Sequence, residues 1–277
     1  MARTMAENTL NTVFEYDEHN LGETRTMFQH YGLLDLFERM PGLLESLRRE
    51  IEQHLGSVQD SLARADAAGN LHHRWDMILR VYMALSVWQQ LVMAAGHLFR
   101  GHVSEVFKDV RRAVEAAGIA YLARLEPDLG AVFLSTDRNA MRNRTTSAKL
   151  FPRDSNDPLL VRLRERFDYG SQQSHNNFSS FAARVASDTY IGDDERLHIK
   201  TKFDLCEMAD HGYVVGIAVW LLRAAECTAL LLARSFDLPD CVWYRRLESY
   251  RRDLDEAAHR LAPMARRYAA RTPSEAA

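Results

Sequence analysis

The sequence predicts an all-α protein: a single-domain helical bundle of about seven or eight helices with one minor β-hairpin. Two long apolar stretches at helical spacing, and alternating apolar and polar residues in one short segment only, predict this class. The 277-residue chain is 47% apolar and 26% charged and shows no internal repeat or low-complexity linker. We expect an acidic N-terminal arm at 1–22, one helical domain at 23–271 and a disordered tail at 272–277.

The strongest helix signal is the run VYMALSVWQQLVMAAGHLF at 81–99, which contains no formal charge. Apolar side chains cover every side of it, so we expect a central helix over 72–99 with no exposed face. Its length would just span a bilayer. However, Gln89 and Gln90 at its centre would be costly in hydrocarbon, so we expect a core helix of a soluble protein and no membrane partner.

Before this run, the sequence predicts a first helix at 31–40 and a second that Pro41 opens, where the missing N–H costs nothing. The second helix is charged apart from one apolar stripe with heptad-like spacing. This stripe is the predicted surface for self-association into a homo-oligomer: Leu44, Leu47, Ile51, Leu55, Val58, Leu62 and Ala65.

After the central run, Gly101 marks a break before a helix at 102–125, which ends at Pro127. A short helix at 128–134 follows. The next segment, STDRNAMRNRTTSAK at 135–149, is predicted to be a basic loop.

Asp157 then caps a helix with Pro158 at its first position. That helix gives way to the polar segment GSQQSHNNFSS at 170–180, which we interpret as a helix break.

A change of period predicts the β-hairpin at about 188–203. From Asp204 the chain returns to a second buried helix that ends near Phe236. The last helix is rich in arginine and is predicted to break at Pro263.

Charge and cysteine usage limit the classes of protein to which this chain can belong. The net charge of −3 gives no overall case for nucleic acid, and the N-terminus lacks the apolar region of a secretory signal. Cys206, Cys227 and Cys241 show no CxxC spacing, which indicates free thiols in a reducing cytoplasm. The 31 arginines against four lysines suggest a GC-rich bacterial genome.

Local clusters of basic residues nevertheless predict contacts with phosphates. In the predicted loop the candidate nucleic-acid-binding residues are Arg138, Arg142, Arg144 and Lys149. A second cluster lies in the last helix: Arg245, Arg246, Arg251, Arg252, Arg260, Arg266, Arg267 and Arg271.

The candidate catalytic residues are charged groups in apolar surroundings. Glu115 lies in the helix at 102–125, and Arg223 and Glu226 lie in the second buried helix. Such charges must be paired. We expect the three to converge, with Glu115 as a partner of Arg223 and with His175 as a general acid or base. The alternative is that these charges simply pair with one another and form no site.

Two ExxH matches raise the possibility of a di-iron site: Glu195 to His198 and Glu256 to His259. Residues three apart on a strand point to opposite faces, and the second pair lies on an exposed helix. We therefore expect no bound metal and no cofactor.

Glu115 in RRAVEAAGIAYLARLEPDL, together with FDYGSQQSHNNFSSF at 167–181, resembles a class of uncharacterised bacterial all-helical proteins, some of them HEPN-like. The resemblance covers about 100–181 and implies a helical fold without a particular activity. The Arg-x4–6-His pattern of HEPN ribonucleases occurs about as often as composition alone predicts.

We expect a nucleic-acid-directed module of a bacterial stress or defence system, with RNA or DNA as its partner. The alternative is a non-catalytic interaction protein that self-associates through the stripe from Leu44 to Ala65. A metal-dependent oxidoreductase is the third hypothesis. Whether the protein is an enzyme is left open.

Overall fold

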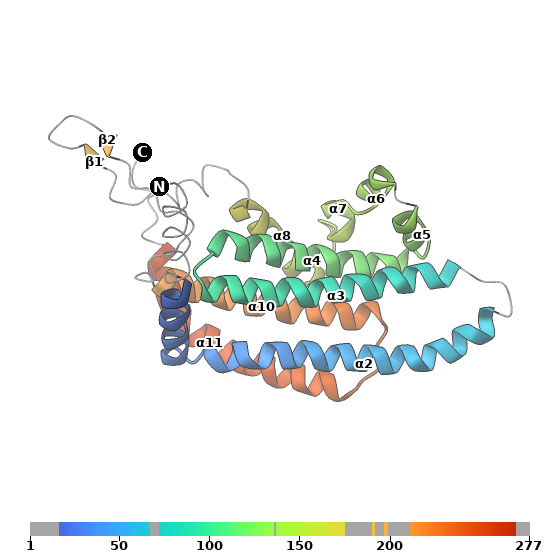
Figure 1. Cartoon of the computed structure of the whole chain (residues 1–277), viewed down its shortest axis with the longest axis horizontal. Helices are drawn as coiled ribbons and strands as arrows, with labels where there is room; N and C mark the ends of the chain where they lie inside the picture. Colours follow the sequence, from blue (N-terminus) through green and yellow to red (C-terminus); the bar gives the residue numbers. More distant parts are fainter. Residues whose placement is uncertain are drawn as a thin grey trace, which may run out of the picture.

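The computed structural model describes residues 17–66, 72–135, 137–174, 190–191, 197–198 and 211–269, with side chains at 17–56, 75–135, 137–173 and 211–264. This part of the chain is an all-α bundle, as predicted (Figure 1). Its helices are a segment at 17–30, α2 (Leu34–Asp66), α3 (His72–Phe99), α4 (Val103–Leu125), α5 (Leu129–Leu134), α6 (Arg138–Arg144), α7 (Ser147–Leu150), α8 (Pro158–Ser174), α10 (His211–Ser235) and α11 (Val242–Ala269).

The described residues hold ten helical segments, so the prediction of seven or eight was too low. The predicted loop at 135–149 contains two short helices, α6 and α7. Residues 17–22 of the predicted acidic arm are helical, and the Asn20 side chain is buried. The rest of the arm and the tail at 272–277 lie outside the described residues.

Two prolines that were predicted to begin or break a helix lie inside one. α2 begins at Leu34 and continues through Pro41, and α11 continues through Pro263. Each proline removes one backbone hydrogen bond. In α2, Met40 and Leu44 on either side of the proline are both buried, so apolar burial offsets that loss.

α10 is the central helix of the bundle. It packs against α2, α3, α4, α8 and α11, and most of its side chains are buried. In Figure 1 the five long helices α2, α3, α4, α10 and α11 run along the long axis, and the dark blue helix at 17–30 crosses them at one end. The second apolar run of the sequence, and not the first, is therefore the one that other helices surround.

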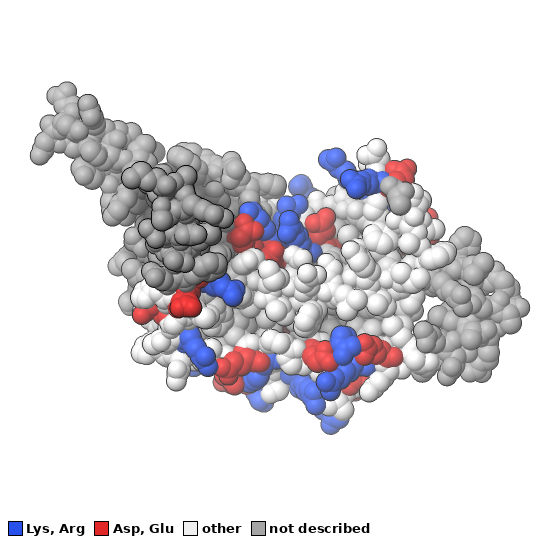
Figure 2. Space-filling view, viewed as in Figure 1, with Lys and Arg blue, Asp and Glu red and all other residues white. Residues whose placement is uncertain are grey.

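The prediction that α3 has no exposed face is wrong. α4 and α10 cover part of α3, but a line of large apolar side chains remains exposed, and Figure 2 shows an uncharged band there. This exposed stripe consists of Trp75, Ile78, Tyr82, Leu85, Trp88 and Met93.

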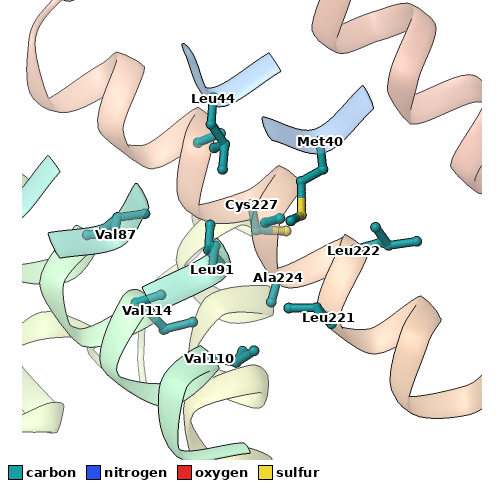
Figure 3. Close-up of a cluster of buried hydrophobic side chains, with 14 of the residues drawn as sticks. Met40, Leu44, Val87, Leu91, Val110, Val114, Leu221, Leu222, Ala224 and Cys227 are labelled. Carbon is teal, nitrogen blue, oxygen red and sulfur yellow. The ribbon is translucent and has the colours of Figure 1, made fainter. Parts of the chain in front are cut away.

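The hydrophobic core fills the space between α2, α3, α4 and α10 (Figure 3). Apolar side chains from all four helices meet there, and the thiol of Cys227 lies among them. The labelled members are Met40, Leu44, Val87, Leu91, Val110, Val114, Leu221, Leu222, Ala224 and Cys227.

Two glycines supply what a residue with a side chain would not, Gly101 a positive φ and Gly130 a close approach between helices. Gly101 has φ +80° in the short turn between α3 and α4, where the N–H of His102 donates to the carbonyl of His97. Gly130 of α5 lies directly against the backbone of Trp75, so an added Cβ would overlap α3. These contacts fix α4 and α5 against α3.

The β structure that the described residues contain is a pair of two-residue strands. β1 (Tyr190–Ile191) and β2 (Leu197–His198) are antiparallel, with Tyr190 opposite His198. The other residues of the predicted hairpin at 188–203 lie outside the described part.

Within the described residues, two helices are long and apolar enough to cross a membrane by length and composition alone: Trp75–Phe99 and His211–Ser235. For α10, 72% of the apolar window is buried inside the bundle, which accounts for its composition. For α3 the buried share is only 33%. Burial within one chain therefore accounts for only some of the apolar side chains of α3.

Candidate phosphate-binding groove

A wide groove of about 810 Å³ lies between α4, α6 and α8. This volume is in the range of small-molecule binding sites. Basic, hydroxyl and aromatic side chains line it together: Arg111, Glu115, Phe133, Asp137, Arg138, Met141, Arg142, Thr145, Thr146, Ser147 and Phe167.

Local capping sets the geometry of α6. The carboxylate of Asp137 accepts hydrogen bonds from the backbone N–H groups of Asn139 (3.0 Å) and Ala140 (2.9 Å). The helix therefore begins at Arg138, and Arg142 follows one turn later on the same side. Both arginines are exposed at the groove, and within the described part of the chain neither forms an ion pair.

Arg111 contributes a third positive charge from α4. Its Nε is buried without a hydrogen-bond partner, and its guanidinium lies 5.2 Å from the centre of the Phe167 ring. Among the described residues, no carboxylate forms an ion pair with it. Sequence reasoning missed Arg111, although its four-residue spacing from Glu115 would have placed the two on one face of the helix.

Arg144, the third candidate in the predicted loop, forms hydrogen bonds with carboxylates of its own chain. Its guanidinium donates to Glu126 (3.1 Å) and to Asp128 (3.0 and 3.1 Å). These hydrogen bonds lower the pKa of Asp128 and raise that of Arg144. Arg144 therefore holds α6 against the α4–α5 turn. The fourth candidate, Lys149, is exposed on α7 and does not line the groove.

Of the predicted catalytic residues that the structure describes, Arg223 and Glu226 form an ion pair, and Glu115 forms none with either of them. Arg223 donates to Glu226 (3.3 Å) and to Asp255, and Arg251 donates to Glu226 (2.6 Å). The prediction that Glu115 is the partner of Arg223 is therefore wrong, and the alternative of mutual pairing holds for Arg223 and Glu226. Glu115 lies instead in the groove described above.

His175 lies outside the described residues, as do Glu195 of the first ExxH match and Cys206. The second match, Glu256 and His259, is exposed on α11. Where the structure describes side chains, no group of three or more His, Cys, Asp or Glu residues is arranged to hold a metal ion.

Several described arginines of the predicted α11 cluster have partners within the protein. Arg246 donates to Ser46 (2.9 Å), and Arg260 donates to the carbonyl of Tyr31 (2.8 Å). Arg252 lies 3.6 Å from Asp253. Among the members whose side chains the structure describes, Arg245 is exposed on α11.

Two histidine–aspartate pairs form a second polar cluster, at the α3–α4 turn. His97 Nδ1 lies 2.9 Å from Asp109 Oδ2, and His102 Nε2 lies 3.1 Å from Asp17 Oδ1. The two imidazoles stack with centroids 6.0 Å apart. Burial raises the pKa of Asp109, and the hydrogen bond with His97 opposes this shift. No sequence motif marks these pairs, because the turn at Gly101 brings them together.

Comparisons of the chain with family models, with curated proteins and with solved structures find no match. The resemblance to HEPN-like proteins stays a prediction.

Proposed function

We propose that the protein binds nucleic acid through the groove between α4, α6 and α8. The observation that carries this proposal is the presence of three arginines without ion-pair partners among the described residues, Arg111, Arg138 and Arg142, around one groove. Arginine side chains bind phosphate oxygens in a bidentate manner, and unpaired ones need not first break an internal ion pair.

The aromatic side chains favour a single-stranded ligand. Phe133 and Phe167 lie in the groove wall beside the arginines and are only partly buried. Single-strand-binding proteins combine a basic track for the backbone with aromatic rings on which bases stack. Glu115 adds a carboxylate that can accept hydrogen bonds from base amino groups.

We extend the proposal to the biological setting that composition and resemblance suggest. The chain would act as a nucleic-acid-directed module of a bacterial stress or defence system. The arginine groove supports the nucleic-acid part of this proposal, and identification of the bound nucleic acid from cells would test the rest.

The salt dependence of binding tests the groove directly. We expect a fluorescent single-stranded RNA or DNA to bind at low salt, with an affinity that falls as salt is added. Replacing both Arg138 and Arg142 with Ala removes two phosphate contacts. The slope of log affinity against log salt should therefore decrease by about 1.4, at about 0.7 per contact for single strands. Fluorescence anisotropy over a salt series measures this slope.

Arg245→Ala is the matched control, because it removes one exposed arginine on α11, away from the groove. It should leave the slope unchanged. Equal effects of the groove and α11 variants would show that binding is not at the groove. Absence of binding by the wild type at low salt would refute nucleic-acid binding altogether.

A further inference from the structure

The exposed stripe of α3 is unusual because it consists of large apolar side chains. Its six side chains, Trp75 to Met93, are between 41% and 57% exposed and follow one side of the helix. At about 200 Å² for a large side chain, they expose roughly 600 Å² of apolar surface. That is at the upper limit for the largest apolar patch on a soluble monomer.

Beside this stripe lies an apolar groove between α2 and α3. The two helices both pack on α10 but contact each other little, which leaves space between them. The groove is lined by Leu44, Leu47, Ile51 and Leu55 of α2, by Val81, Ala84, Leu85, Val87 and Trp88 of α3, and by Leu232 of α10.

A second groove continues along the same seam toward the helix at 17–30. It is lined mainly by apolar residues, among them Phe37 and Met40 of α2 and Val92 and Phe99 of α3. Together the two grooves follow α3 from Val81 to Phe99, a length of about 27 Å at 1.5 Å per residue. This length matches a packed helix of five turns.

The stripe and the groove adjoin along α3, where Leu85 and Trp88 belong to both. The stripe is a line of exposed apolar side chains, and the groove is an apolar depression of similar length. In a two-fold interface a residue i that contacts residue j of the partner is matched by j contacting i of the partner, and residues on the axis meet their own copies. The stripe of each copy can therefore enter the groove of its partner.

The charged residues at the edge of the groove favour a second copy over other occupants. On the exposed side of α2 they are Glu45, Arg48, Arg49 and Glu52, two of each sign, and both arginines donate to Glu45. Such an edge is neutral and can face a copy of itself. Nucleic acid and anionic lipid surfaces attract edges with excess positive charge.

We propose that the protein forms a two-fold symmetric dimer in which α3 of each copy packs into the α2–α3 groove of the other. The apolar stripe alone supplies about 600 Å² of the roughly 800 Å² per partner that a stable interface buries. In the dimer α3 becomes enclosed, which explains why it carries apolar residues on every side. The predicted stripe on α2 supplies only a wall of this groove, because Leu44, Leu47 and Ile51 are buried inside their own chain and the exposed apolar side chains belong to α3.

Sedimentation velocity of the full chain tests this proposal. The wild type should sediment with twice the chain mass of 31.8 kDa. Leu85→Glu puts a charge at the centre of the stripe and should yield the monomer with an unchanged circular dichroism spectrum, because Leu85 is half-exposed in one chain. Val161→Glu on α8 is the matched control, at a residue that is 40% exposed outside this surface, and should remain dimeric.

A second measurement keeps the proposal testable if Leu85→Glu fails to fold. Because Leu85 belongs to both the stripe and the groove lining, the proposed dimer places it near the two-fold axis. Leu85→Cys should therefore form a disulfide-linked dimer under mild oxidation, whereas Val161→Cys and the wild type should not. A monomeric wild type at about 100 μM refutes the dimer. Monomers that float with neutral phospholipid vesicles would instead assign the stripe to a membrane surface. A dimer that persists in Leu85→Glu and shows no cross-link through Leu85→Cys would place the interface elsewhere.

Discussion

At the scale of single residues, buried charges are held by partners that secondary structure alone does not reveal. Asp76 and Arg80 lie one turn apart on α3, and both are at most 9% exposed. Arg80 donates to Asp76 (2.9 Å) and to the carbonyl of Ser235 at the end of α10 (2.7 Å). The pair therefore ties the two most apolar helices together, and each charge depends on the other for neutralisation.

We predict that Asp76→Ala destabilises the protein by about 3–5 kcal/mol, because it leaves the guanidinium of Arg80 buried without a counter-charge. Asp35→Ala is the control. Asp35 also pairs with an arginine one turn away, but its side chain is 71% exposed, so the change should be within about 0.5 kcal/mol. Urea unfolding measures both values, and similar losses for the two variants would contradict the prediction.

A second prediction concerns the buried carboxyl of Asp109. Burial raises its pKa in the folded protein above the unfolded value of about 3.9. The group therefore contributes stability below about pH 3.9, and this contribution is lost as pH rises through the folded pKa. Asp109→Asn should remove that loss, so the free energy of unfolding of the variant relative to the wild type should increase from pH 3.5 toward neutrality.

Urea unfolding at a series of pH values checks this prediction. Asp253→Asn is a suitable control, because Asp253 accepts a hydrogen bond from Arg39 but is one-third exposed. A difference between Asp109→Asn and wild type that stays constant with pH would show that the carboxyl titrates with an ordinary pKa in the folded protein.

At the scale of the elements, the sequence predicted helices best where local chemistry sets their ends. The predicted helix at 72–99 matches α3, and that at 102–125 matches α4 to within one residue. Asp157 begins α8 as predicted, since its carboxylate accepts from the N–H of Leu159 (2.9 Å). Apolar periodicity and capping are local properties, so sequence shows them directly.

Prediction failed where tertiary contacts override local preference. Pro41 and Pro263 lie inside helices because apolar residues around them remain on a buried face. The apolar run at 81–99 indicates how much surface α3 must bury but not what buries it. Likewise, the groove arginines Arg111 and Arg138 come from two helices whose juxtaposition no local pattern encodes.

One element-scale prediction tests how α5 sits on α3. Gly130→Ala should destabilise the protein by about 1–3 kcal/mol or more, because the added methyl would overlap the backbone of Trp75 and Asp76, which cannot rotate away. Gly42→Ala in α2 is the control, since nothing lies within 4 Å of its added Cβ. It should stabilise the helix by up to about 1 kcal/mol. Thermal unfolding compares the two, and similar melting temperatures would contradict the predicted overlap.

At the scale of the whole molecule, the described part is one core built from both ends of the chain. The indole N–H of the buried Trp243 on α11 donates to the carbonyl of Leu43 on α2 (3.1 Å). Arg39 of α2 also donates to Asp253 of α11 (2.8 Å). The helices between them close the bundle, so no described long helix forms a separate unit with its own core.

The contact between α2 and α11 has a consequence for synthesis on the ribosome. Leu43 and Trp243 are 200 residues apart, and at about 5–20 residues per second the second is made roughly 10–40 s after the first. Throughout that interval the part of the apolar face of α2 that α11 covers remains exposed. The nascent chain therefore presents a long-lived binding site for chaperones, and ribosome-bound chains that stop before α11 should be far more sensitive to protease than the released protein.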